Sequence, residues 1–597
     1  MFSQSEIAMK RFWVYISVLF FVSLHAEPEK KGILPPVFSQ KVSELAQFDT
    51  RTRAYISPVR IMWTQNEELI AGAENLLLPG NGQATTAKTA KCIFTSKEGK
   101  RPSILLDFGC EIQGGLQFVT CKRNVTKPIK IRVRLGESVG EAMCEITPEN
   151  GATNDHAMRD YIIELPWLGV CEVGNSGFRF VRIDMVEDNV SLPIKEIRAC
   201  LVYRDIPYLG SFRSSDPRVD SIWLTGAYTL HLNLQEYLVE APKRDRLVWL
   251  GDLHPEVRTA LAVFGDNEAL SRGLDFARDE TPLPGWMNGK CTYSLWWILI
   301  HRDYYRYHGN LTYLKEQQPY LGKLLKILIS NVDKQGNEHL EKGRFLDWPT
   351  SKNKKAVDSG IHALMLMSLD AGAEMMSALG DVGLAEQCSE TASRMREVIP
   401  EYTASKQSAA LAVLAGIVPA EKANKDVIQV GGAKGFSTFY GYYMLQAQGL
   451  AGDYVGAIQN MKEYWGGMLD LGATTFWEDF DIDWKENASR IDDLTPPGKI
   501  DVHKTYGDYC YKGYRHSLAH GWASGPTAWL SEYVLGVSIV EPGCKVVKIE
   551  PHLGALQWVE GTFPTPYGVI KVRHNRRPDG SVESEVEAPK GIKIIKR

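Results

Sequence analysis

The chain has little excess of either charge and few long apolar runs. Its 597 residues carry 68 Lys and Arg against 72 Asp and Glu, for a formal net charge of −4. No block of like charge interrupts this balance, which argues against a nucleic-acid groove or a polybasic membrane patch. After the N-terminal region, no stretch is apolar for long enough to span a bilayer. The sequence therefore predicts no nucleic-acid partner and no stable membrane insertion, and it leaves the oligomeric state open.

The cysteines lack a recognisable pattern. The ten residues include no Cys-x-x-Cys pair and no Cys/His cluster with the spacing of zinc ligands, so we expect no metal site. Six of the ten lie between positions 92 and 200, where one or two disulfides could form. Buried free thiols explain the same residues, so both interpretations stay open.

Residues 1–26 have the features of a signal peptide. Lys10 and Arg11 form a basic start, and residues 12–24 are mostly apolar but too few to span a bilayer as an ordinary helix. Leu24-His25-Ala26 is an acceptable cleavage site. An uncleaved anchor helix is the alternative. We expect an exported protein, either periplasmic or extracellular.

The region 35–207 is predicted to form an N-terminal β-sandwich. Residues 129–135 alternate between apolar and polar, which places the apolar side chains on one face of a sheet. Similar runs bounded by Gly, Asp or Asn occupy 103–108, 115–121 and 178–186. Short strands separated by turns are typical of a sandwich, which could bind carbohydrate or be purely structural.

The region 212–536 is predicted to be helical, because the apolar period changes from two to about 3.6. The helix expected over 361–379 ends at Gly380-Asp381. Further helices are expected over 220–237, 295–307, 313–332, 384–398, 405–416, 437–450, 453–466 and 522–535. Roughly a dozen helices with short connections favour a toroid of helical hairpins over a four-helix bundle.

Residues 537–597 return to short alternating strands, punctuated by prolines and a Pro578-Asp579-Gly580 turn. They predict a small C-terminal β-sandwich. The expected fold is thus multidomain, with a central helical barrel flanked by two β-sandwiches.

The densest group of functional side chains lies in residues 240–256, in an expected loop between two helices. It comprises four carboxylates with arginines and a tryptophan: Glu240, Arg244, Asp245, Arg246, Trp249, Asp252 and Glu256. Any one carboxylate could cap a helix, and Arg244 could simply pair with a neighbour. Their concentration in one loop favours a site over a solvated surface.

A second group, in residues 472–480, places Glu478 directly after Phe476 and Trp477. Neighbouring rings would partly desolvate the carboxylate and raise its pKa unless a positive partner offsets this. The alternative is a surface glutamate that follows a core aromatic pair.

A third group, in residues 514–526, contains His516 and His520. Their spacing would place both on one face of a helix, where they could bind a metal, but no third ligand is evident nearby. We therefore expect hydrogen bonding to a sugar hydroxyl. Gly525-Pro526 makes a continuous helix through this segment difficult.

Two carboxylate groups far apart in sequence suit glycoside hydrolysis. That reaction needs one protonated carboxyl group to protonate the leaving oxygen and a second, ionised one acting from the opposite face. Loops from different hairpins of a toroid would meet in one cleft. Some of the 15 Trp, 25 Tyr and 20 Phe could stack on apolar sugar faces there, although many must be core.

On these residues the chain resembles the bacterial α-L-rhamnosidases of glycoside hydrolase family 78, which have a six-hairpin (α/α)6 barrel. The family motif begins with an acidic residue, which is followed by three variable residues, an Arg, and then an Asp or Glu. A Trp and a Gly-Asp pair come further along, and residues 240–252 match this motif in order and spacing. The Gly472-Ala-Thr-Thr-Phe-Trp-Glu478 run is similar to the family segment that bears the general base. His520-Gly-Trp is similar to the family's sugar-contacting histidine segment.

The resemblance implies an inverting exo-hydrolase that releases terminal α-L-rhamnose from a glycan or glycoside without a cofactor. It implies Asp245 as general acid and Glu478 as general base. The substrate-binding residues would be Glu240, Arg244, Trp249, Asp252 and His520, with Trp286, Tyr293, Asp347, Trp348 and Trp477 as further candidates.

Two substitutions depart from the family pattern. The common acid is Glu and the common leading residue is Asp, but here the order is Glu240 and Asp245. The exchange keeps the charges and moves both carboxyl groups by more than about 1 Å, enough to alter rate or sugar preference. Glu256 is therefore a reserve candidate for the acid.

Two rival functions remain at this point. A polysaccharide lyase could also use a helical toroid, with Tyr514, Arg515 and His516 as base and uronate-neutralising groups, and it would release an ultraviolet-absorbing product. A catalytically impaired glycan-binding homologue would keep affinity without turnover.

Overall fold

The computed structural model describes residues 34–87, 91–155, 158–507 and 511–596. The chain forms two compact units, residues 1–50 and 51–597. In the first, helix α2 (Gln40–Leu45) follows Ser39, whose Oγ accepts a hydrogen bond from the backbone N–H of Val42. The predicted signal peptide lies outside the described residues. Among the helices that are described, none is long and apolar enough to cross a membrane.

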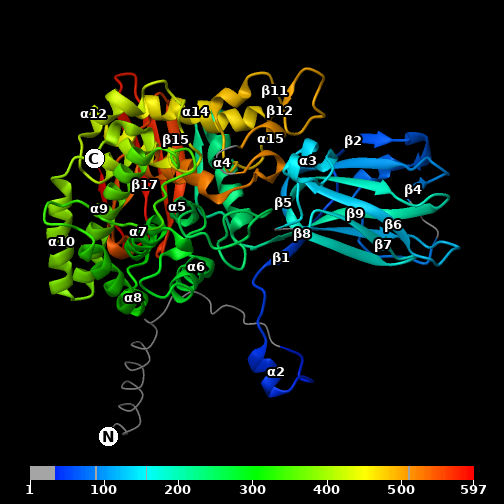
Figure 1. Ribbon diagram of the computed structural model, residues 1–597, viewed down its shortest axis with the longest axis horizontal. Coiled ribbons are helices and arrows are strands. Elements are labelled where there is room, and N and C mark those ends of the chain that lie inside the picture. Colours follow the sequence, from blue (N-terminus) through cyan, green and yellow to red (C-terminus); the bar gives the residue numbers. More distant parts are fainter. Residues whose placement is uncertain (1–33, 88–90, 156–157, 508–510, 597) are drawn as a thin grey trace, which may run out of the picture. The chain divides into compact units, whose positions relative to one another are not determined.

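The second unit begins with a β-domain, drawn in blue and cyan in Figure 1. Its described strands are β1 (Thr52–Ile56), β2 (Arg60–Gln65), β3 (Ile70–Ala71), β4 (Cys92–Thr95), β5 (Ser103–Thr120), β6 (Ile129–Gly136), β7 (Asp160–Leu165), β8 (Val170–Met185) and β9 (Ser191–Tyr203). The strand order is β3-β4-β9-β5-β8-β6-β7, with β1 beside β9 and β2 beside β5.

The long strand β5 belongs to both layers of this domain. Its first part pairs with β2 and β8, its last part pairs with β9 and β8, and the register shifts in between. At the bend Gly114 has φ +150°, and a Cβ there would lie 1.9 Å from the carbonyl oxygen of Cys200, so glycine is required. Leu106 and Phe118, from the two parts, bury into one core. The predicted β-sandwich is confirmed.

Helices follow as a barrel (Figure 1). The helices that form it are α4 (Pro217–Asn233), α5 (Leu253–Val263), α6 (Glu268–Asp279), α7 (Cys291–His308), α8 (Leu311–Ser330), α9 (Lys354–Ala378), α10 (Val382–Arg396), α11 (Lys406–Leu414), α12 (Ala420–Ala423), α13 (Gly441–Leu450), α14 (Tyr454–Asp470) and α16 (Gly525–Trp529), and the short α15 (Val502–Thr505) lies between α14 and α16 in the sequence. Helices α5, α7, α9, α11, α13 and α16 contact one another in that order, and α16 returns to α5, so they close an inner ring.

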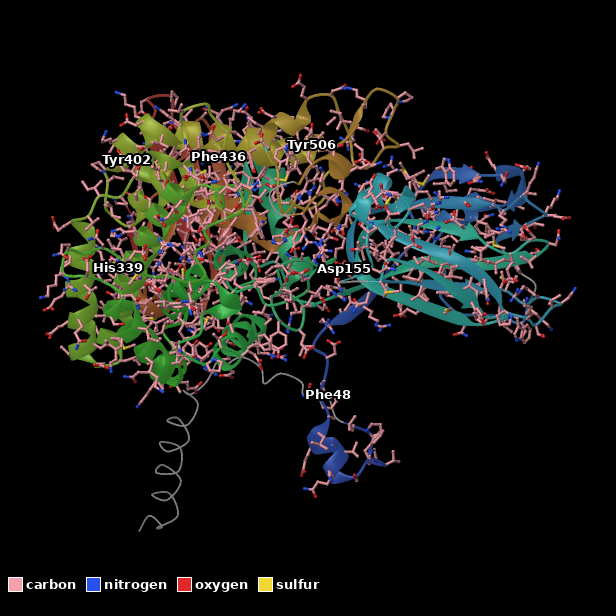
Figure 2. The ribbon with its side chains drawn as sticks, viewed as in Figure 1. Phe48, Asp155, His339, Tyr402, Phe436 and Tyr506 are labelled. Atoms are coloured by element: carbon pink, nitrogen blue, oxygen red, sulfur yellow. The ribbon has the colours of Figure 1, made fainter. Side chains whose placement is uncertain are left out.

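Burial explains which helices are inner. Helix α7 buries residues on nearly every side, whereas α6 buries one stripe and exposes the opposite face, as an outer helix must. Side chains crowd the barrel (Figure 2), and Phe436 packs edge-on against Trp465 with ring centroids 6.4 Å apart. The expected helical barrel is confirmed.

The last barrel helix is shorter than expected. In place of one helix over 522–535, the chain forms a 3-10 turn (Gly521–Ser524), α16, and a π-helical turn (Leu530–Val534). Pro526 stands in the first turn of α16, where its missing N–H leaves no helical hydrogen bond unmade.

The C-terminal β-domain includes a strand from before the barrel. Strand β10 (Ser211–Ser214) pairs with β15 (Trp558–Thr565), followed by β16 (Gly568–Arg576) and β17 (Val582–Glu587). A smaller sheet contains β13 (Val537–Glu541), β14 (Val546–Ile549) and β18 (Lys593–Lys596). Two short strands, β11 (Ala488–Ser489) and β12 (Ile500–Asp501), pair apart from these sheets.

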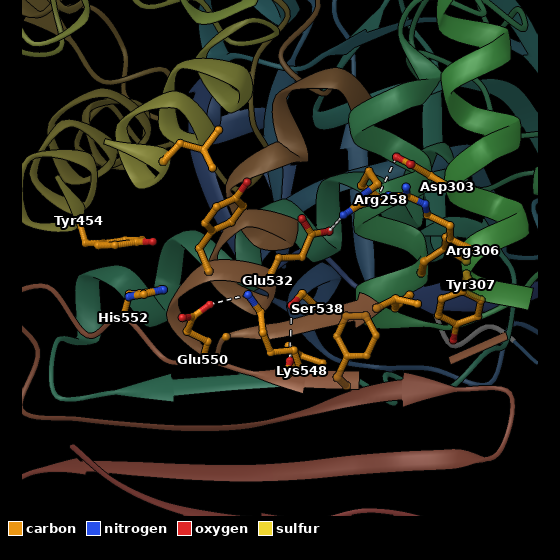
Figure 3. Close-up of a pocket in the computed structure, with 17 residues that line it drawn as sticks. Arg258, Asp303, Arg306, Tyr307, Tyr454, Glu532, Ser538, Lys548, Glu550 and His552 are labelled. Atoms are coloured by element: carbon orange, nitrogen blue, oxygen red, sulfur yellow. Dashed lines mark hydrogen bonds and ion pairs between the residues drawn. The ribbon is translucent and has the colours of Figure 1, made fainter. Parts of the chain in front are cut away.

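A cavity of about 330 Å³ lies between the barrel and the C-terminal strands (Figure 3). Arg258 pairs there with Asp303 at 3.0 Å and with Glu532 at 2.7 Å, and Lys548 pairs with Glu550 at 2.5 Å. These cations and carboxylates satisfy one another, as expected at a structural junction.

In the described part of the chain, which leaves out Cys510, free thiols stand at Cys92, Cys110, Cys144, Cys171, Cys200, Cys291, Cys388 and Cys544. Of the two interpretations of the N-terminal cysteines, the structure therefore favours free thiols, several of them buried.

Candidate active site

A cavity of about 170 Å³ opens at the end of the barrel where loops lead into the inner helices. It is smaller than the pockets of about 300–1,000 Å³ that hold drug-sized ligands, and suits a single sugar ring. Its lining residues are Glu240, Arg244, Asp245, Trp249, Asp252, Lys290, Tyr293, Phe345, Trp348, Glu478, Tyr511, His520 and Trp522. The two carboxylate segments and the histidine segment thus meet, although residues 240–252 are more than 200 residues away from Glu478 and His520 in the sequence.

Glu478 is held as a carboxylate. Its Oε2 accepts hydrogen bonds from Arg244 Nη2 at 2.5 Å and from the backbone N–H of Ser517 at 3.0 Å. Burial alone would raise the pKa of Glu478, but the positive charge of Arg244, with smaller contributions from His520, His516 and the Ser517 N–H, lowers it to about 2. The carboxylate is therefore ionised at neutral pH.

Arg244 is fixed in place by its own contacts. Its Nε donates to the carbonyl oxygen of Arg515 at 2.5 Å, and its guanidinium stacks 3.7 Å from the ring centroid of Tyr511. Its Nη1 lies 3.5 Å from Asp245 Oδ1. One guanidinium thus contacts both Asp245 and Glu478, so the nearest oxygens of these carboxyl groups are no more than about 8 Å apart.

Glu240 organises the turn that carries Asp245. Its two oxygens accept hydrogen bonds from the backbone N–H groups of Asp245 and Leu247. Burial, followed by the nearby carboxylates of Asp252 and Asp245, raises the pKa of Glu240 well above its usual range. Trp249 Nε1 donates to Asp245 Oδ2 at 3.3 Å, and this hydrogen bond fixes the orientation of the Asp245 carboxyl group in the cavity wall.

Asp252 and His520 form a buried pair. His520 Nε2 lies 3.1 Å from Asp252 Oδ2, and the Tyr293 hydroxyl donates to Asp252 Oδ1 at 3.3 Å. Burial raises the pKa of Asp252, although these two hydrogen bonds oppose the shift. The pair supplies polar atoms that can recognise sugar hydroxyls.

Aromatic rings form much of the remaining wall. Trp249 and Tyr293 meet edge-on with centroids 6.3 Å apart, and Phe345 and Trp348 do so at 5.1 Å. Lys290 Nζ lies 5.0 Å from the Phe345 ring centroid. Such rings suit the apolar faces of a pyranose and exclude water.

Four expected site residues do not line this cavity: Trp286, Asp347, Trp477 and Glu256. Asp347 is buried behind it and accepts hydrogen bonds from Gln407 and Ser437, both at 3.1 Å, so it braces the loops around α11 and α13. Trp477 is buried in the barrel core, and Trp286 packs against the same core.

Glu256, the reserve acid, is fully buried in α5, and neither of its oxygens has a hydrogen-bond partner among the described residues. The geometry therefore favours Asp245 over Glu256 as the acid. Conversely, sequence reasoning missed Lys290, Phe345, Tyr511 and Trp522. Of these four residues, only Trp522 could have been predicted from the sequence, because it stands two residues after His520.

The expected helical pairing of His516 and His520 is wrong. His516 follows a 3-10 turn (Gly513–Arg515) and His520 has extended backbone, so they share no helix face. His516 Nε2 accepts a hydrogen bond from the backbone N–H of Asp479 at 2.9 Å, and burial lowers the pKa of His516 to about 3. The ring is neutral and supports the loop of Glu478.

The lyase residues are not assembled in the cavity. The Tyr514 hydroxyl donates to Asp501 at 2.7 Å, and the Arg515 side chain pairs with Asp155. Neither side chain lines the cavity, and neither does His516. The structure therefore gives no support to the lyase alternative.

Comparison with known proteins agrees with this arrangement. The profile of the bacterial alpha-L-rhamnosidase 6 hairpin glycosidase domain matches residues 207–534, and that of the bacterial alpha-L-rhamnosidase C-terminal domain matches residues 536–595. An alpha-L-rhamnosidase from Alteromonas sp. (strain LOR) is 23% identical over 544 residues, which cover 81% of this chain and 54% of that protein. The chain thus spans about half the length of this relative.

Solved structures share the fold. A GH78 family rhamnosidase of Bacillus sp. GL1 superposes with a TM-score of 0.70 at 20% identity, over 88% of this chain and 55% of that one. A rhamnosidase from Klebsiella oxytoca with rhamnose bound gives a TM-score of 0.64 at 18% identity, over 81% of this chain and 96% of that one. Because the glycosidase-domain profile covers more than half of the chain, the protein belongs to the bacterial alpha-L-rhamnosidase family of six-hairpin glycosidases.

Proposed function

We propose that this protein is an inverting exo-α-L-rhamnosidase, which releases terminal α-L-rhamnose from a glycan or glycoside. The observation that carries the proposal is the shared Arg244 contact, which brings Asp245 and Glu478 to the wall of a cavity sized for one sugar ring. The bound rhamnose in the Klebsiella oxytoca relative supports the choice of sugar.

Glu478 is proposed as the general base. Its Oε2 is occupied by Arg244 and Ser517, whereas its Oε1 makes no hydrogen bond to any described residue and is left for a water molecule. The ionised carboxylate takes a proton from that water as the water oxygen bonds to C1 of the sugar.

Asp245 is proposed as the general acid. It gives its proton to the glycosidic oxygen as the bond from C1 to that oxygen breaks, so the leaving group departs as an alcohol. Attack and departure on opposite faces invert the anomeric centre. Inverting pairs are about 6.5–9.5 Å apart, and the limit of about 8 Å set by the Arg244 contacts is compatible with that range.

Glu240, Asp252 and His520 are proposed to bind sugar hydroxyls, with Trp249 against the ring. Glu240 already accepts two backbone hydrogen bonds, from Asp245 and Leu247. The glutamate at this position, one methylene longer than the common aspartate, therefore also fixes the turn that carries Asp245, which is one methylene shorter than the common glutamate acid. We propose export of the protein on the basis of residues 1–26.

The test is a screen of the purified protein against aryl α-L-rhamnoside and other aryl glycosides, with Glu478→Gln as the matched variant. We expect rhamnose release that the variant loses by more than about a hundredfold. Cleavage of another sugar alone would refute the rhamnose assignment. Rhamnose binding without turnover would instead indicate a glycan-binding protein, and an ultraviolet-absorbing product would indicate a lyase.

A further inference from the structure

A buried ionic cluster of the β-sandwich reaches the candidate catalytic loops. Glu137 follows β6, and Glu141 lies in the short helix α3 (Val139–Met143). Lys243, the residue before Arg244, extends from the barrel loop into this domain. Its Nζ lies 2.8 Å from Glu137 Oε2 and 3.2 Å from Glu141 Oε1. All three side chains are at most 4% exposed.

The cluster is an ion-pair junction and not a cation site. Glu137, Glu141 and His503 offer atoms within 4.8 Å of one another, a spacing that could hold a metal. However, the Lys243 ammonium already lies against both carboxylates, and Arg159 pairs with Glu141 as a second cation. His503 is engaged through both ring nitrogens, with Ser138 Oγ and the carbonyl oxygen of His516, each at 2.8 Å.

Glu137 holds the loop that supports Glu478. Its Oε2 accepts a hydrogen bond from the backbone N–H of Leu518 at 2.6 Å, and its Oε1 accepts one from Ser517 Oγ at 3.3 Å. The N–H of the same Ser517 donates to Glu478 Oε2, and the N–H of Glu478 donates back to the carbonyl oxygen of Ser517 at 3.0 Å. Movement of residues 517–518 would therefore move the candidate base.

Lys243 holds the same loop from the other side. Its Nζ donates to the carbonyl oxygens of Tyr514 at 2.9 Å and His516 at 2.7 Å. Its neighbour Arg244 makes the ion pair with Glu478. Both segments that contact the Glu478 carboxylate are thus tied to one buried pair, Glu137 and Lys243.

We propose that Glu137 and Lys243 are positioning residues for the hydrolysis, so that the N-terminal β-sandwich is part of the catalytic apparatus. Their ion pair fixes the register of residues 243–245 against residues 514–518, and thereby the orientation and charge of Glu478. This inference rests on the proposed function, because it assigns Glu478 a role in turnover.

The test compares Glu137→Gln and Glu137→Asp with the control Asp184→Asn. Glutamine removes the charge, and aspartate keeps it but is one methylene too short to reach Lys243 and Leu518 together. Asp184 is a buried carboxylate of the same domain, paired with Arg134 at 2.7 Å and Arg182 at 2.8 Å, and these contacts lie within the domain. Asp184→Asn therefore removes a buried ion pair from the same domain, as Glu137→Gln does, without touching the contacts to residues 514–518.

Two readouts distinguish positioning from mere stabilisation. Hydrogen–deuterium exchange of peptides covering 476–480 and 514–520 should be at least about fivefold faster in both Glu137 variants and unchanged in Asp184→Asn. On aryl α-L-rhamnoside, kcat should fall on the order of tenfold or more with a smaller change in KM. An acid limb of kcat/KM from Glu478 should also appear above about pH 3, where the unmodified enzyme shows none, because Glu478 loses part of the support for its ionised form.

The outcomes separate this inference from the proposed function. If the unmodified protein turns over no rhamnoside, the proposed function fails and the role in hydrolysis fails with it, and the exchange measurement then tests only whether Glu137 holds residues 514–518 in place. If Glu137→Gln does not fold, Glu137→Asp carries the test because it keeps the charge. Wild-type exchange in both segments of a folded Glu137 variant, together with no acid limb from Glu478 above about pH 3, would overturn the inference.

Discussion

Arg244 is the charge that keeps Glu478 ionised, so Arg244→Met should change the pH dependence of the enzyme. The Nη2–Oε2 contact is 2.5 Å long, and both side chains are at most 7% exposed. Burial pushes the pKa of Glu478 upward, and Arg244 is the largest opposing contribution. Methionine keeps most of the side-chain volume and removes the charge.

The size of the effect follows from the pKa. Glu478 has a pKa of about 2 against an ordinary value of 4.5, a difference worth about 3 kcal/mol. Because the folded-state pKa is lowered, this stabilisation is present above about pH 4.5 and is lost as the pH falls through about 2. Without Arg244 the burial contribution dominates, and the pKa of Glu478 should rise above 4.5.

The assay is kcat/KM on aryl α-L-rhamnoside from pH 3 to 8. The unmodified enzyme should show no acid limb from Glu478 above about pH 3, whereas Arg244→Met should show one at about pH 5 or higher. Arg515→Gln is the control, since its guanidinium also lies over the Tyr511 ring, at 4.8 Å, but its ion pair is with Asp155. An Arg244→Met profile with the wild-type acid limb would refute the assigned base.

Three further predictions concern the acid, the sugar contact and the fold. Asp245→Asn should lose at least about a hundredfold more activity on an alkyl rhamnoside than on a dinitrophenyl rhamnoside, whose leaving group needs no proton; equal losses would exclude Asp245 as acid. His520→Ala should raise KM about tenfold with a smaller effect on kcat, and a pure kcat effect would contradict sugar binding. Arg258→Met should lower the free energy of unfolding by about 3–5 kcal/mol, because Asp303 and Glu532 stay buried and lose a partner. Arg306→Met, in the same cavity, removes an exposed arginine that pairs with the half-buried Glu374, so it should cost less than about 1 kcal/mol, and equal losses in denaturant titrations would contradict this account.

Local patterns in the sequence predicted most elements of the barrel. The helix expected over 361–379 is the core of α9, because its apolar spacing repeats with the helical period. Helices α5 and α6 were not predicted. Helix α5 begins directly after Asp252, inside the polar-rich motif. The closure of the inner ring and the pairing of β10 with β15 depend on contacts between distant segments, which no local pattern specifies.

The site was predictable where one motif concentrates chemistry. Five residues of the 240–252 segment, Glu478 and His520 do meet in one cavity. The positive partner that offsets the desolvation of Glu478, which the sequence had left open, is Arg244. Trp477 was misplaced because neighbouring residues in a loop point in different directions, so it enters the core while Glu478 lines the cavity. Phe345 and Tyr511 lie in loops without periodicity or charge clusters, so only tertiary structure brings them to the wall.

The most direct test of the central claim is the anomeric configuration of the first rhamnose released, followed by proton NMR in deuterated buffer. An inverting reaction, with Glu478 activating water opposite the departing group, predicts that β-L-rhamnose forms first and the α anomer appears only by mutarotation. Initial formation of α-L-rhamnose would mean retention, and would contradict the roles assigned to Asp245 and Glu478.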